Sequence, residues 1–349
     1  MSANDGAGTG PRSLASRVAR DRPGARMPRR AFIAAGLVAT LARRPLAAAS
    51  RPRARVGYLD PLGKSDGERL YRDFVDGLEE QGYVAGRNLQ IVRRSAGGDT
   101  EGLRNLAAEM AAERVDVILA TTAQAARSAK VGAPRIATVF VISSDPVIEG
   151  LVASLSRPQG RLTGLVTRGE DLTAKRLQLL KEAFPAIRTV AIVGSNIGMS
   201  RVAFVDAARR LQVEVLTFAV NRYDDYREAA AAISRSPADA LLVVEDVNDV
   251  TGMHAFVRLM MATRRPVMFN ADVFVEEDAF GLMAYGVSLR QQYRRAAAIV
   301  AKVLEGANPA DIPVEQPTRY ELVVNLRAAE EYRLALPREF VLRADRVIR

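Results

Sequence analysis

The order of apolar segments constrains this chain more than any other feature of its sequence. From Arg53 onward, short apolar runs alternate with segments whose apolar residues recur at helical spacing. The runs at 136–142 and 189–193 are apolar almost throughout and do not alternate with polar residues. Such runs are typical of parallel strands covered by helices on both faces. The sequence therefore predicts an α/β protein.

The predicted elements form two similar series. In the first, strands are expected at 55–59, 89–93, 115–120 and 136–142, with helices at 67–81, 103–114 and 123–131. In the second, strands at 189–193, 214–218, 240–244 and 266–269 alternate with helices at 199–211, 223–235 and 252–263. The segment 281–286, a long helix at 289–304, a strand at 320–324 and an Ala-rich tail helix follow. Two Rossmann-like halves are expected, because 349 residues exceed what one core accommodates.

The excess positive charge belongs mainly to the first 50 residues. The whole chain carries a net charge of +10, but residues 1–50 contain nine Arg against Asp5 and Asp21, which is +7. The remaining 299 residues are close to neutral at +3. The charge therefore does not indicate a nucleic-acid partner.

The first 49 residues have the composition of an export leader. Arg29-Arg30 and Phe32 precede an apolar run from Ala34 to Ala42, and small residues follow at Ala47 and Ala49. This segment resembles a twin-arginine signal, which we expect to be cleaved near Ala49. The apolar run is shorter than the roughly 20 residues that a membrane anchor needs. Translation could start at Met1 or at Met27.

The absence of cysteine limits the chemistry and the localisation of the chain. Zero cysteines exclude disulfides, thiolate metal sites and a lipid-modified N-terminal cysteine. We therefore expect a freely soluble periplasmic protein with no membrane anchor in its mature form. We also expect neither a metal nor a cofactor.

Polar residues directly follow most predicted strands, at the edge where open α/β sheets bind ligands. Thr121 and Thr122 could hold a carboxylate with free backbone N–H groups, although helix capping is the alternative for either threonine. Ser144 is a ligand candidate, whereas Asp145 before Pro146 is better explained as a turn residue.

The second half offers a similar set of strand-end residues. Asp246 is a candidate for binding an ammonium group, with Glu245 as its rival and a solvated loop as the alternative. Phe274 could cover an apolar ligand side chain. The remaining ligand-binding candidates are Asn196, Asn270, Asp272 and Tyr285.

The sequence does not favour an enzyme. His254 is the only histidine, there is no cysteine, and no Gly-x-Ser-x-Gly elbow occurs. Neither a phosphate-binding loop nor a Gly-x-Gly-x-x-Gly sequence follows the first strand. Any ATP hydrolysis must therefore belong to a partner subunit.

Short sequences spread over residues 53–349 carry a family resemblance. They include Gly82-Tyr83-Val84-Ala85-Gly86-Arg87-Asn88, Ser144-Asp145-Pro146-Val147, Gly281-Leu282-Met283-Ala284-Tyr285-Gly286 and Glu321-Leu322-Val323-Val324-Asn325-Leu326. In this order they resemble the ABC transporter substrate-binding proteins, the family that includes tryptophan and tyrosine binders. The resemblance implies a type I periplasmic-binding fold, with two Rossmann-like lobes joined by three crossovers.

The resemblance also implies domain boundaries, a function and partners. Lobe one would combine 53–165 with 286–318, and lobe two 166–285 with 319–349, with crossovers near 163–168, 282–287 and 317–321. The monomeric protein would close on a small molecule, such as an amino acid or a related compound, and deliver it to an ABC permease and ATPase. A periplasmic sensor or scavenger is the alternative. A lac-repressor-like regulator would need a helix-turn-helix where this chain has its leader.

Overall fold

A computed structural model describes residues 53–61, 67–97, 100–167, 172–194, 201–220, 225–244, 253–276 and 280–349. The predicted leader at 1–49 lies outside the described residues. None of the described helices combines the length and apolar character needed to cross a bilayer.

The first sheet contains five parallel strands in the order β2-β1-β3-β4-β5. Its strands are β1 (Ala54–Asp60), β2 (Leu89–Ser95), β3 (Val117–Ala120), β4 (Ala137–Ile142) and β5 (Leu162–Val166). The helices packed on it are α1 (Glu68–Glu80), α2 (Leu103–Ala112), α3 (Ala123–Gly132) and α8 (Leu289–Leu304), with short turns η1 (Thr100–Gly102) and η4 (Pro309–Asp311). Strand β5 had not been predicted from the sequence.

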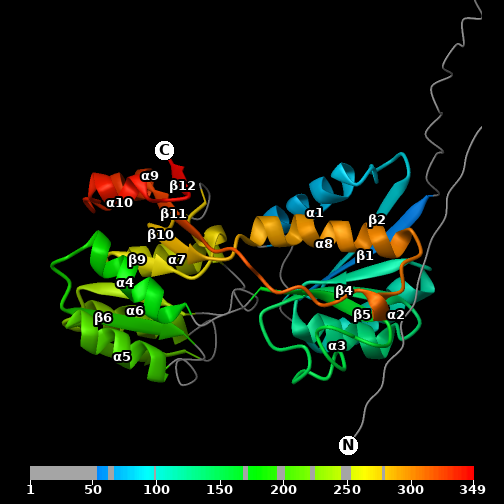
Figure 1. Cartoon of the computed structure of the whole chain (residues 1–349), viewed down its shortest axis with the longest axis horizontal. Coiled ribbons are helices and arrows are strands. Elements are labelled where there is room, and N and C mark those ends of the chain that lie inside the picture. Colours follow the sequence, from blue (N-terminus) through cyan, green and yellow to red (C-terminus); the bar gives the residue numbers. More distant parts are fainter. Residues whose placement is uncertain are drawn as a thin grey trace, which may run out of the picture. The chain divides into compact units, whose positions relative to one another are not determined.

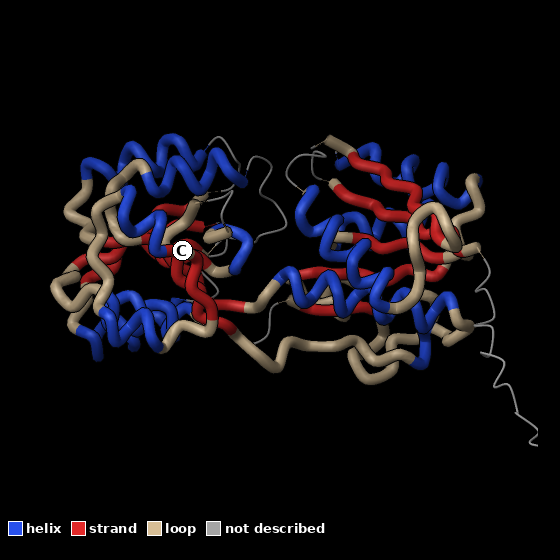
Figure 2. Tube along the Cα trace, turned by 90° about the horizontal axis from the view of Figure 1, so that it is seen from above, coloured by secondary structure: helices blue, strands red, loops and turns tan. Residues whose placement is uncertain are grey.

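Both faces of the first sheet are buried, which explains its continuously apolar strands. Val117 and Leu119 of β3 pack into the core beneath α1 and α8, whereas Ile118 and Ala120 pack into the core beneath α2 and α3. Figure 2 shows helices on both sides of the strands. A strand whose neighbouring residues enter two different cores must be apolar at every position.

The second sheet contains seven strands in the order β12-β11-β10-β9-β8-β6-β7. They are β6 (Thr189–Gly194), β7 (Glu214–Ala219), β8 (Ala240–Val243), β9 (Val267–Phe269), β10 (Met283–Gly286), β11 (Glu321–Asn325) and β12 (Arg346–Ile348). The accompanying helices are α4 (Thr173–Ala183), α5 (Arg201–Leu211), α6 (Asp225–Arg235), α7 (Met253–Met261), η3 (Asp272–Phe274), α9 (Leu326–Glu331) and α10 (Arg338–Leu342). Only β10 and β11 pair antiparallel among these strands.

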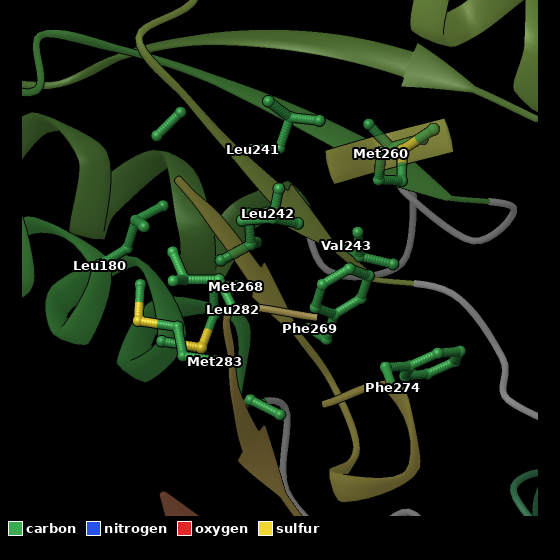
Figure 3. Close-up of a cluster of buried hydrophobic side chains, with 14 of the residues drawn as sticks. Leu180, Leu241, Leu242, Val243, Met260, Met268, Phe269, Phe274, Leu282 and Met283 are labelled. Carbon is green, nitrogen blue, oxygen red and sulfur yellow. The ribbon is translucent and has the colours of Figure 1, made fainter. Parts of the chain in front are cut away.

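The core of the second sheet combines strand side chains with an aromatic ring from the short helix η3. Leu241, Leu242 and Met268 lie together at its centre (Figure 3). The rings of Phe269 and Phe274 stack with their centroids 5.5 Å apart, and both side chains are fully buried. Burying a side chain of this size contributes about 1.5–3 kcal/mol to folding.

The chain passes between the two sheets three times. It leaves the first sheet after β5, returns to it after β10 through α8, and enters the second sheet again at β11. Glu315, just before the last passage, forms a bridge with Leu165 of β5. The predicted α/β class with two Rossmann-like halves and three crossovers is therefore confirmed.

The prediction of a tail helix is wrong. The C-terminal residues form two short helices, α9 and α10, and the chain ends on β12, which pairs parallel with β11. Arg333 adopts a left-handed conformation with φ of 56°, and Pro337 precedes α10, so that one continuous helix is interrupted. The strand forms because β11 offers a free edge, which no local pattern reveals.

A glycine permits the close approach of α1 and α8, which lie side by side over the first sheet (Figure 1). A Cβ added at Gly77 would lie 2.8 Å from the Cα of Arg294 and 2.8 Å from the Cβ of Ala297. Because one of these neighbours is backbone, a larger residue would push the helices apart.

We expect Gly77→Val to lower the free energy of unfolding by about 1–3 kcal/mol through overpacking, although valine is the better helix former. Urea unfolding followed by circular dichroism would measure the change. Glu79→Val, at an exposed position of the same helix, is the control. Equal stability of the two variants would contradict this account of Gly77.

Candidate ligand-binding site

The carboxyl ends of β1 and β3 bring a carboxylate and a hydroxyl together. The side chain of Thr121 donates a hydrogen bond to Oδ1 of Asp60 over 3.2 Å, and both residues are buried. The sequence analysis does not include Asp60 among the site candidates, although this residue directly follows the predicted strand 55–59. The rule that selected Thr121, polarity directly after a strand, would have found it.

Two buried tyrosines surround this pair. Thr121 and Tyr58 are hydrogen-bonded to Tyr293 of α8. Burial raises the pKa of both tyrosines, and the negative charge of Asp60 raises each further. The phenols therefore remain protonated at neutral pH, and the strand-end carboxylate is held within a hydrogen-bonded network.

Arg93 of β2 contributes a positive charge to this network. The guanidinium of Arg93 lies 4.4 Å from the centroid of the Tyr71 ring and forms an ion pair with Glu68 over 2.6 Å. Tyr71 in turn packs edge-on against Tyr58 with centroids 5.1 Å apart. The hydrogen bond from Arg93 lowers the pKa of Glu68. Arg93 is thus committed to Glu68 and to the two aromatic rings.

Thr122 caps the helix that follows it. Its hydroxyl accepts a hydrogen bond from the backbone N–H of Ala125 over 3.1 Å, which makes Thr122 the N-cap of α3. Helix capping, the alternative named from the sequence, therefore accounts for this side chain. The cap holds the first turn of α3, with its outward N–H groups, at the same edge as Asp60 and Thr121.

Ser144 lies two residues beyond β4 and differs from its neighbours. Its Oγ is buried and has no hydrogen-bond partner among the described residues. Asp145, by contrast, caps its own turn, because Oδ1 accepts from the backbone N–H of Val147 over 2.8 Å. A buried hydroxyl left unsatisfied costs about 1–3 kcal/mol. In the first sheet Oγ1 of Thr138 has the same property but lies within β4, whereas Ser144 lies beyond the end of that strand.

In the second sheet, the side chain of Arg176 of α4 forms hydrogen bonds with two predicted site residues. It donates to the backbone oxygen of Tyr285 over 2.7 Å and to that of Asn270 over 3.3 Å. Both residues are half-buried. The Tyr285 ring lies 6.3 Å from that of Tyr320, centroid to centroid. The structure thus brings together an amide and two phenol rings at the ends of β9 and β10.

Asp272 has a structural role at the start of α8. Its carboxylate accepts from the Ser288 hydroxyl over 2.7 Å and from the backbone N–H of Leu289 over 3.0 Å. The guanidinium of Arg346, in β12, lies 3.7 Å from Oδ2 of Asp272. Both carboxylate oxygens of Asp272 accept hydrogen bonds, and only 2% of the residue is exposed. Asp272 therefore stabilises the start of α8 and is not accessible to a ligand.

A second buried carboxylate, Glu276, joins three elements at this junction. Arg69 of α1 lies 3.0 Å from it, Arg346 of β12 lies 2.7 Å from it and Arg290 of α8 lies 3.9 Å from it. Breaking such a buried group's pairing is costly, because an uncompensated charge remains. This junction was not predicted, since its members are up to 277 positions apart in the sequence.

Three other predictions have different outcomes. Phe274 is fully buried in the core of the second sheet and does not cover a ligand. Asn196 and Asp246, with its rival Glu245, lie outside the described residues. The described part of the chain contains no group of three or more His, Cys, Asp or Glu side chains placed to bind a metal.

Two α/β units, three crossovers and polar residues at the strand ends define the type I periplasmic-binding class of protein. The family model for ABC transporter substrate-binding proteins matches residues 65–348. The chain belongs to this family, so it is a substrate-binding protein of the ABC transporter type.

Individual proteins that resemble this chain in sequence or structure are also binding proteins or transporter domains. The tyrosine-binding protein of Clostridioides difficile (strain R20291) is 22% identical over 303 residues, 85% of this chain and 86% of the relative. A Streptococcus pneumonia ABC domain in complex with L-Trp has a TM-score of 0.71 at 22% identity, covering 85% of this chain and 100% of that one. The 5-methylthioribose transporter solute-binding protein of Thermotoga lettingae TMO has a TM-score of 0.55 at 16% identity, covering 84% and 92%. At these identities the solved structures establish the fold.

The pH dependence of stability tests the structural role of Asp272. Burial raises its pKa from 3.8 to about 6, partly offset by the hydrogen bond from Ser288. Because the folded pKa exceeds the unfolded one, proton uptake favours the folded state as the pH falls through the range 6 to 4. Arg346 and Glu276 are the charged groups that face it.

We therefore expect the unfolding free energy of the wild type, minus that of Asp272→Asn, to rise by about 1–3 kcal/mol between pH 7 and pH 4.5. Parallel urea titrations of the two proteins would measure this difference, in which the contributions of carboxylates that do not interact with Asp272 cancel. A difference that stays constant or falls with decreasing pH would refute the raised pKa.

Proposed function

We propose that this protein is the solute-binding component of an ABC uptake transporter, which closes its two lobes on one small molecule. In this proposal lobe one comprises 53–165 with 286–318, and lobe two comprises 166–285 with 319–349. The observation that carries the proposal is the Oγ of Ser144, which is buried and has no hydrogen-bond partner in the part of the chain that the structure describes, at the strand-end edge that also holds Asp60 and Thr121. A ligand that hydrogen-bonds this hydroxyl would recover its desolvation cost.

The ligand class that these groups favour is an amino acid or a close relative. The first turn of α3 and Ser144 suit a carboxylate, since both supply hydrogen-bond donors. Asp246 is the proposed partner of the ammonium group, and the amide of Asn270 is a further polar contact. The half-buried rings of Tyr285 and Tyr320 suit an aromatic side chain. The tryptophan and tyrosine named for two relatives support this class.

Export and partners follow from the same proposal. The leader at 1–49 would direct the protein through the twin-arginine route to the periplasm, with cleavage near Ala49. There the monomeric protein would bind its ligand and deliver it to a permease and ATPase. Lobe closure would let the permease distinguish loaded from empty protein by shape.

Ligand-dependent thermal stability tests the proposed function. We expect L-tryptophan or L-tyrosine, added to ligand-stripped protein at about 100 times its Kd, to stabilise the folded state by about 2.7 kcal/mol and raise Tm by several degrees. Scanning fluorimetry across amino acids, purines and small carboxylates would measure the shift. If no compound of these classes shifted Tm, the proposal would fail.

A hydroxyl-specific variant tests the site itself. We expect Ser144→Ala to weaken binding of the amino acid about tenfold in calorimetry, because one hydrogen bond to a charged group is lost. The stability of the unliganded variant should match or exceed that of the wild type, since a buried unsatisfied group is removed. Ser128→Ala, within α3, is the control. Unchanged affinity would remove Ser144 from the site.

A further inference from the structure

Arg176, on the first turn of α4, contacts two strands of the second sheet at the point where their pairing ends. Strands β9 and β10 are paired in parallel up to Phe269 and Ala284. The residues that follow these two, Asn270 and Tyr285, each have a backbone carbonyl that accepts a hydrogen bond from the guanidinium of Arg176. One side chain from a separate helix thus holds the two strand ends together where the proposed ligand residues begin.

The backbone is closely packed around these hydrogen bonds. A Cβ added at Gly286 would lie 2.0 Å from the backbone oxygen of Asn270 and 3.4 Å from Nη2 of Arg176. Because the nearer of these atoms belongs to the backbone, no larger residue fits at position 286 without moving a strand end. Gly286 is also the last residue of β10 before the chain crosses into α8. Arg176 therefore acts where the chain leaves the second sheet.

The two hydrogen bonds of Arg176 differ in length. Nε lies 2.7 Å from the backbone oxygen of Tyr285, a distance typical of charge-assisted hydrogen bonds. Nη2 lies 3.3 Å from the backbone oxygen of Asn270, slightly beyond the usual range for N–H···O bonds. Because the guanidinium is planar and its donors have fixed directions, the short bond restrains the backbone of Tyr285. Arg176 therefore restrains Tyr285 more strongly than Asn270.

This restraint determines where the ring of Tyr285 lies. The backbone of Tyr285 is held by Arg176 and also by antiparallel pairing with Leu322 of β11. Only two side-chain torsions separate a tyrosine ring from its backbone, so a fixed backbone leaves the ring few positions. The ring lies 6.3 Å from that of Tyr320, centroid to centroid, at an interplanar angle of 46°. The position of one guanidinium therefore affects the arrangement of the two rings.

We propose that Arg176 is a positioning residue, which holds Tyr285 so that its ring contacts an aromatic side chain of the ligand. This inference rests on the proposed function, in which the rings of Tyr285 and Tyr320 surround that side chain. Arg176 acts through Tyr285 and not through a contact of its own with the ligand. A ring that is already held in its binding position costs less to order when the ligand arrives, which raises the affinity.

A double-mutant cycle separates this role from a general stabilising one. The probe is L-tryptophan, titrated by calorimetry into the ligand-stripped mature protein. We expect Arg176→Gln to weaken binding at least tenfold. Arg176→Lys should lose nearly as much, because an ammonium group lacks the planar arrangement of donors. Tyr285→Ala keeps the backbone carbonyl and removes only the ring. In that background Arg176→Gln should weaken binding less than threefold further, since the ring through which it acts is absent.

The matched control is Lys175→Gln, which removes the neighbouring positive charge and should leave the tryptophan affinity unchanged. The ammonium of Lys175 donates to Gln178 of the same helix over 3.3 Å. If circular dichroism shows that Arg176→Gln does not fold, Arg176→Lys takes its place in the cycle.

Two results would overturn the proposal while leaving the proposed function intact. In the first, the Arg176 variants bind tryptophan as tightly as the wild type does. In the second, the Arg176 substitution weakens binding by the same factor with and without the Tyr285 ring, which would indicate a general effect on the lobe. If the wild type itself binds no tryptophan, the proposed aromatic ligand fails, and this inference fails with it.

Discussion

Hydrogen bonding between parallel strands, with helices on both faces, is the constraint on which the rest of this structure depends. Each strand end must be followed by a crossover that returns the chain to the other end of the sheet. All five strands of the first sheet therefore end at one edge. Polar side chains excluded from the two apolar cores collect there, which is why Asp60, Thr121 and Ser144 lie on neighbouring strands.

The residues at this edge are of two kinds: some maintain the structure, and others are available to a ligand. Thr121 and Thr122 have hydrogen-bond partners within the chain, one at Asp60 and the other at the start of α3. The Oγ of Ser144 has none among the described residues. A ligand that binds there meets a preformed network and pays little for ordering it.

Near the passage from β10 into α8, two buried carboxylates pair with partly exposed arginine side chains. Asp272 fastens the first turn of α8, and Glu276 joins Arg69 of α1 to Arg346 of β12. Removing one partner from such a group is costly, because it leaves an uncompensated buried charge. The two carboxylates connect the second sheet with the two helices that Gly77 allows to pack closely on the first.

By itself, the sequence determined the fold class, most element positions and the strand ends that carry polar residues, because these follow from local periodicity. It was silent on β5, on the antiparallel β10–β11 pair and on β12, since strand pairing depends on a distant neighbour's free edge. It also could not separate Ser144 from Asp272. Both are polar residues just after a strand, and only the tertiary structure decided that one hydroxyl lacks a partner while the other side chain is fully engaged. That difference depends on Ser288 and Leu289, which approach Asp272 only when α8 folds back onto the first sheet.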